Sequence, residues 1–126
     1  MSFRIVIPLK RNSDFKIKLL SELSNIGYTW SQGDPLSKEP STFSRAKYLA
    51  INIIQNTCSY SSKSTALDKW KTGLGYNYII DFENVNYILE CIKYFQNYVA
   101  QDSLSYTEMD TFVNSHFSLK KEIKLL

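Results

Sequence analysis

Residues 85–99, VNYILECIKYFQNYV, carry the most regular apolar pattern of the 126-residue chain. Their large apolar side chains recur at spacings of three and four, as on one face of an α-helix. Such a stripe must be buried, so the rest of the chain has to supply the surface that covers it. Asp81 or Asn84 is available to cap this helix. The stripe consists of Val85, Ile88, Leu89, Ile92, Phe95 and Val99.

Short segments before this helix alternate between apolar and other side chains, as β-strands with one buried face do. In residues 3–9, every second side chain from Phe3 to Leu9 is large and apolar. Pro8 has no N–H to donate to a neighbouring strand, so we expect this strand to lie at an edge of a sheet or to end there. Similar patterns predict strands at residues 28–30, 47–54, 57–61 and 76–81.

Two more helices are expected, one after the first strand and one near the C-terminus. Ser13 can cap the first, whose apolar side chains recur at helical spacing from Phe15 to Ile26 before Gly27 ends it. Near the C-terminus, a capping box is followed by another apolar stripe. The box spans residues 105–108, and the stripe consists of Met109, Phe112, Val113 and Phe117.

Together these patterns predict an α+β fold in a single domain, residues 1–126. We expect one antiparallel sheet of four to five strands, with one inserted helix and two C-terminal helices packed on one face. The core is expected within residues 3–100, and residues 101–126 are expected to form the last helix and a tail. The polar residues 61–75 predict an irregular segment.

Composition and charge limit the classes of function. The chain is 44% hydrophobic and 21% charged, as globular proteins are, which argues against disorder. Its net charge of +3 is well below that of proteins that bind nucleic acid by charge alone. The sequence has no signal-peptide pattern and no apolar run approaching the roughly 18 residues of a membrane span. We therefore expect a cytoplasmic protein with no membrane partner.

Side chains suited to catalysis or metal binding are sparse. Cys58 and Cys91 are accompanied by a single histidine, His116, which leaves too few ligands for a zinc site of the usual kind. We expect two free, mostly buried thiols and a structural or surface histidine, with a Cys–His pair as the formal alternative. Asp81 and Glu83 precede a helix, where carboxylates more often cap than catalyse. We therefore expect no metal, no cofactor and no enzyme activity.

Residues 25–36, NIGYTWSQGDPL, connect the first helix to a short strand and contain two of the four glycines. Gly27 fits the end of a helix, and Gly33 fits a turn. Tyr28 and Trp30 then lie on one side of the strand. The segment is either a structural connection or an interface that exposes Tyr28 and Trp30 as anchors, because aromatic side chains concentrate in binding hot spots.

A second candidate site lies in the polar segment. Lys69, Trp70 and Lys71 place an aromatic ring between two cations, a combination that stacks on bases and neutralises phosphates. Trp70 is also a candidate anchor for a protein partner. The competing interpretation is that Trp70 folds back onto the sheet while its lysines stay solvated. For nucleic-acid binding, a basic face near the first strand adds Arg4, Lys10 and Arg11.

The order of these motifs resembles a pattern in small accessory proteins of tailed bacteriophages. In that pattern a helix runs into Gly-Tyr-x-Trp-x-x-Gly, a tyrosine-rich hairpin follows, and a strand then leads into a final helix. In this chain the polar segment 61–75 and the two C-terminal helices are longer than the corresponding segments of that pattern. The resemblance covers roughly residues 3–90 and rests on Gly27, Tyr28, Trp30, Gly33, Tyr48, Ile51, Tyr60 and Ile79.

The resemblance implies a protein that binds a host enzyme or a defence component inside the host cell, as anti-CRISPR proteins do, and it supplies no catalytic residues. The leading hypothesis is thus a non-enzymatic accessory protein that sterically inhibits its partner. The alternative is a small nucleic-acid-binding protein, and a third hypothesis is a ligand pocket between the sheet and the last two helices. Because those helices carry more apolar surface than such a sheet covers, we also expect a C2 homodimer through them.

Overall fold

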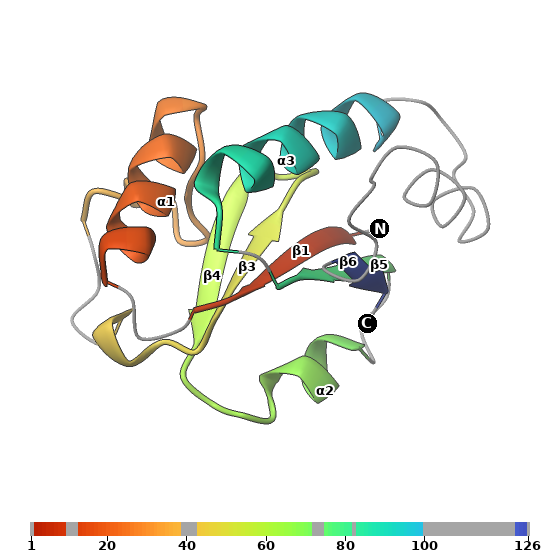
Figure 1. Ribbon diagram of the computed structural model, residues 1–126, viewed down its shortest axis with the longest axis horizontal. Helices are drawn as coiled ribbons and strands as arrows, with labels where there is room; N and C mark the ends of the chain where they lie inside the picture. Colours follow the sequence, from red (N-terminus) through yellow and green to blue (C-terminus); the bar gives the residue numbers. More distant parts are fainter. Residues whose placement is uncertain are drawn as a thin grey trace.

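The computed structural model describes residues 2–9, 13–38, 43–71, 75–81, 83–99 and 123–125. These residues form one six-stranded mixed sheet with helices on both of its faces (Figure 1). The strands are β1 (Ser2–Pro8), β2 (Thr29–Trp30), β3 (Tyr48–Asn52), β4 (Thr57–Ser61), β5 (Gly75–Ile80) and β6 (Ile123–Leu125). The helices are α1 (Ser13–Asn25), α2 (Ala66–Lys71) and α3 (Val85–Val99), with a 3₁₀ turn at Phe43–Arg45.

The sheet has the strand order β2-β4-β3-β1-β5-β6. Neighbours β1–β3, β3–β4 and β5–β6 are antiparallel, whereas β1–β5 and β2–β4 are parallel. The α+β class is therefore confirmed, but the expected antiparallel sheet is wrong. Apolar alternation reports which face of a strand is buried and is the same for either strand direction, so it does not predict parallel pairing.

Strand β1 lies in the interior of the sheet, between β3 and β5. Pro8 is its last residue, opposite Tyr48, so the missing N–H falls where the strand ends. Val6 points to the opposite face from Ile5 and Ile7, yet its exposed fraction is also 0%. The centre of β1 is thus buried on both faces, as expected for a central strand.

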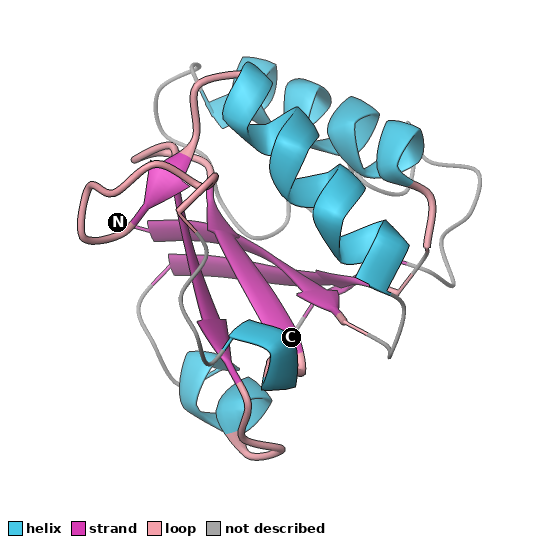
Figure 2. Ribbon diagram, turned by 90° about the vertical axis from the view of Figure 1, so that its left-hand side faces the viewer, coloured by secondary structure: helices cyan, strands magenta, loops and turns pink. Residues whose placement is uncertain are grey.

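Helices α1 and α3 cover one face of the sheet, and α2 lies on the other (Figures 1 and 2). Of the three helices expected on one face, the two that the structure describes, α1 and α3, do share it. The difference is a further short helix, α2, which forms inside residues 61–75, where an irregular segment was expected. On the α2 side, Val6 and Ala50 are neighbours in the β1–β3 register and both are buried. The expected helix after residue 105 lies outside the described residues.

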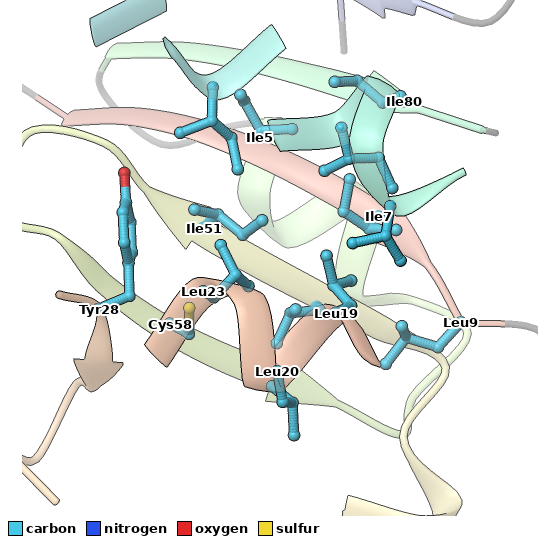
Figure 3. Close-up of a cluster of buried hydrophobic side chains, with 14 of the residues drawn as sticks. Ile5, Ile7, Leu9, Leu19, Leu20, Leu23, Tyr28, Ile51, Cys58 and Ile80 are labelled. Carbon is cyan, nitrogen blue, oxygen red and sulfur yellow. The ribbon is translucent and has the colours of Figure 1, made fainter. Parts of the chain in front are cut away.

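The main core fills the space between the sheet and the α1–α3 layer (Figure 3). The predicted stripe of α3 is confirmed at Val85, Ile88, Ile92 and Phe95, which are at most 5% exposed. Phe95 stands over two rings of the sheet, with centroids 5.1 Å from Phe3 and 5.5 Å from Tyr78. Leu89, by contrast, is only partly buried, so the edge of the stripe reaches the surface.

The ends of the two long helices follow the capping rules. Asn84 caps α3, because its Oδ1 accepts a hydrogen bond from the Tyr87 N–H at 3.1 Å. At the end of α1, Gly27 adopts φ 96°, and the Tyr28 N–H donates to the Leu23 carbonyl at 3.0 Å. Among the described residues, no helix has the length and apolar character needed to cross a bilayer.

Candidate functional site

Trp30 is a core residue. It is 2% exposed and packs against Phe43 and Tyr60, with ring centroids 5.5 and 5.7 Å away. Its indole N–H donates to the Lys38 carbonyl at 3.2 Å, which satisfies the one polar atom of the ring. Of the two interpretations of this segment, the one that exposes Trp30 as an interface anchor is therefore wrong. Gly33 adopts φ 96° in the tight turn that follows, and this turn folds the chain back so that the indole is enclosed.

Tyr28 is equally buried, at 2% exposed, and Figure 3 shows its ring in the core beside Leu23 and Cys58. Gln96 Nε2 of α3 donates to its hydroxyl oxygen at 2.7 Å. Burial, which outweighs this hydrogen bond, raises the pKa of Tyr28 to about 12. The Gly-Tyr-x-Trp motif thus works as a structural connection, and its tyrosine joins the short strand β2 to α3.

The two cysteines are free and buried, as expected. Burial is the main cause that raises the pKa of each thiol to about 12, so neither is a thiolate near neutral pH. Neither side chain can serve as a nucleophile in this conformation. His116, the partner of the formal Cys–His alternative, lies outside the described residues. Within the described residues, no cluster of three or more metal-binding side chains occurs.

Stability should fall as the pH rises above about 9. The unfolded chain releases the two thiol protons near its ordinary pKa of 9.0, whereas the folded protein holds them until about 12. Stability that is fully present below pH 9 is therefore lost progressively toward pH 12. Urea unfolding should show a loss of about 1 kcal/mol for each thiol between pH 8 and pH 10. An equal loss in the Cys58→Ala/Cys91→Ala variant would contradict this assignment.

Trp70 lies in α2, on the face of the sheet opposite α1 and α3 (Figure 1). It is half-buried, and its ring meets that of Tyr48 in β3 edge-on, with centroids 6.4 Å apart. Lys69 beside it is exposed, and the side chain of Lys71 is not among those described. Trp70 therefore covers part of the sheet, as the competing interpretation states, while part of the residue remains accessible.

Of the residues expected to form a basic face near the first strand, Arg4 is the one that the structure describes, and it does not lie beside Trp70. Arg4 is half-buried and lies opposite Asn52, whereas Tyr48 lies opposite Pro8. Arg4 is therefore four residues along β1 from the level of the Trp70 contact, or about 13 Å at the rise of a strand. Lys10 and Arg11 lie outside the described residues.

Sequence reasoning missed a hollow on the outer surface of the α1–α3 layer, which we call the helix groove. It has a volume of about 580 Å³ and runs along α3 beside the end of α1. Two large apolar side chains that line it are exposed: Ile26 at 49% and Tyr94 at 40%. Leu89 and Ile92 continue its apolar lining. The polar lining residues are Glu90, Lys93, Gln96 and Asn97.

The groove could not be predicted from the sequence because Ile26 and Tyr94, its two exposed apolar residues, each adjoin or continue a buried helical stripe. Ile26 continues the helical spacing of Leu19 and Leu23, but it lies just past Asn25, the last residue of α1, and is exposed. Tyr94 adjoins the buried Phe95, and only the helical angle of about 100° per residue separates their directions. Smaller hollows of about 360 and 260 Å³ lie beside Trp30 and beside Leu36.

Comparison with known proteins supplies no relative. No family model, no curated protein and no solved structure matches this chain. Functional proposals for the protein therefore rest on its own residues and their geometry.

Proposed function

We propose that the protein is a non-enzymatic accessory protein of the phage type, which binds a host protein or defence effector and blocks it sterically. The helix groove is the docking surface. The observation that carries the proposal is that Ile26 and Tyr94, from different helical segments, are both exposed and line the same hollow of about 580 Å³. Single exposed apolar residues are ordinary, but paired ones lining a hollow are typical of interfaces.

The chemistry of the groove supports protein recognition. Its apolar residues lie on either side of charged and amide side chains of α3. The surface therefore offers apolar contact area together with charged and hydrogen-bonding groups, as protein interfaces do. Tyrosine is one of the residue types that dominate binding energy, because it offers a large amphipathic surface with few rotatable bonds. Tyr94 is also held on a rigid base, since its neighbour Phe95 is 0% exposed. A pre-organised anchor loses little entropy on binding.

The resemblance to phage accessory proteins supports the choice of partner class. Its Gly-Tyr-x-Trp-x-x-Gly motif gives no exposed aromatic anchor, because both aromatic residues are buried. The motif instead sets the geometry of the groove: Gly27 ends α1 just after Ile26, and Tyr28 is hydrogen-bonded to Gln96 in the groove wall. The motif residues therefore do not contact the partner themselves; they support the surface that binds it.

The test is affinity capture from an extract of the bacterial host. Tagged wild-type protein should retain a saturable host protein, and the Ile26→Ser/Tyr94→Ser variant should retain at least tenfold less, because hot-spot residues each contribute about 2 kcal/mol or more. Ile54→Ser is the matched control, since Ile54 is 45% exposed but lies in the turn between β3 and β4. Equal capture by the groove variant and the control would contradict the proposal.

A second candidate function is single-stranded nucleic-acid binding at α2, favoured by the accessible part of Trp70 and the exposed Lys69. Fluorescence anisotropy with a labelled oligonucleotide tests it. If this function is real, binding weakens with salt at a slope near −0.7 per displaced phosphate contact. Trp70→Ala should then lower affinity by about tenfold, because stacking contributes about 1–3 kcal/mol per base. No binding at tens of micromolar protein in low salt would exclude it.

A further inference from the structure

We infer that a second copy of this chain covers the helix groove in the free protein, with α3 packed antiparallel against α3 of the other copy around a two-fold axis. The inference rests on the proposed function in one respect: both treat the groove as a surface that binds protein. It adds that self-association regulates access to this surface. The dimer is specified by the order of the residues on the outward side of α3.

The outward side of α3 is self-complementary in sequence. Asn86, Glu90, Lys93 and Asn97 are exposed and project in nearly the same direction, within about 60° of one another around the helix. Suppose that α3 pairs antiparallel with α3 of the other copy, with Glu90 opposite Lys93. Each residue nearer the N-terminus of one helix then faces a residue equally nearer the C-terminus of the other. Asn86 then lies opposite Asn97 of the other copy. Acid thus meets base and amide meets amide, and each match occurs twice, as an isologous interface requires.

Charge fixes the register of this pairing. Sliding one α3 by a turn in one direction brings the two copies of Glu90 together, and sliding it the other way brings the two copies of Lys93 together. Like charges in direct apposition are unfavourable, so both shifted registers are disfavoured. The matched register instead contains two Glu90–Lys93 pairs that cross the axis.

Apolar residues flank this polar centre on both sides. Leu89 and Tyr94 are five positions apart, so they project about 140° from each other around α3. A two-fold axis perpendicular to the paired helices brings the same flank of each copy together. Tyr94 therefore meets Tyr94 of the other copy on one side, where tyrosine rings can pack edge-to-face or offset. Leu89 and Ile26 meet their counterparts on the side of α1.

The interface is small. One helical stripe with Ile26 falls below the roughly 800 Å² per partner that a standard stable interface buries. The dimer is consequently weak and depends on concentration, so a host protein that makes a larger contact displaces the second copy. Dilution then frees the groove, and a high protein concentration masks it.

Sedimentation equilibrium of the full chain from about 5 to 500 μM tests the inference. Charge-reversal variants of α3 are the most specific part of this test. The wild type should rise from the 14.6 kDa monomer mass toward twice that value. Glu90→Lys and Lys93→Glu should each raise the dimer dissociation constant about tenfold, because two attractive pairs become repulsive. The Glu90→Lys/Lys93→Glu variant should recover the wild-type constant, and an equimolar mixture of the two single variants should form a mixed dimer.

A wild type that stays monomeric throughout this range would overturn the inference, as would a double reversal that dimerises no better than the single variants. The two proposals fail separately. If the wild type is monomeric and the Ile26→Ser/Tyr94→Ser variant still loses the host protein, the dimer is wrong and the docking function stands. If charge reversal behaves as expected but the groove variant captures as much host protein as the wild type, the dimer stands and the docking function is wrong.

Discussion

Replacing Trp30 with alanine is expected to lower the free energy of unfolding by about 3–5 kcal/mol. The change removes a side chain that is 2% exposed and leaves a cavity against Phe43 and Tyr60. It also leaves the Lys38 carbonyl without its indole donor. Domains of this size are stable by about 5–15 kcal/mol, so the loss is a large share of the total.

Urea unfolding followed by far-ultraviolet circular dichroism measures this loss without depending on tryptophan fluorescence. Trp70→Ala is the matched control, because it removes the same side chain from a half-buried position in a six-residue helix. We expect it to cost about 1 kcal/mol. If both variants lost the same free energy, the assignment of Trp30 to the core and Trp70 to the surface would be contradicted.

Phe95→Ala is expected to have an effect of similar size, about 3–5 kcal/mol. Phe95 is 0% exposed and packs against the rings of both Phe3 and Tyr78, so its removal opens a cavity between α3 and the centre of the sheet. Its neighbour Tyr94 is 40% exposed, and Tyr94→Ala is expected to cost about 1 kcal/mol or less.

This pair of adjacent positions also separates stability from function. The same urea measurement on Tyr94→Ala shows whether groove variants remain folded, which is needed before any loss of binding is assigned to the surface. A loss above about 3 kcal/mol for Tyr94→Ala, or below about 1 kcal/mol for Phe95→Ala, would mean that the outward and inward sides of α3 are assigned wrongly.

The elements with strong periodic patterns could be predicted from the sequence. The α3 stripe, the alternation of β1 and the glycine end of α1 are all local signals, and the structure places them as expected. The direction of strand pairing could not be predicted, because a buried strand shows the same alternation in either direction. The helix α2 was missed because its six residues, ALDKWK, form too short a segment to show helical periodicity.

Local patterns also could not show which aromatic residues reach the surface. Trp30 and Trp70 both sit in polar surroundings along the chain, and only the long-range contacts with Phe43 and Tyr60 bury the first of them. Ile26 fits the buried stripe of α1 by spacing, yet it lies past the last helical residue and is 49% exposed. The groove combines Ile26, just past the end of α1, with Tyr94 on the outward side of α3, so no single stretch of sequence contains it.

Site-specific photo-crosslinking tests the central claim, that the helix groove is the docking surface, most directly. A photoreactive phenylalanine analogue would replace Tyr94 in one sample and Ile54 in another, and both would be irradiated in host extract. The groove position should yield a discrete crosslinked host protein that excess unlabelled wild-type protein competes away, and position 54 should yield none. Crosslinks to a host protein from position 54 alone, or from neither position, would contradict the claim.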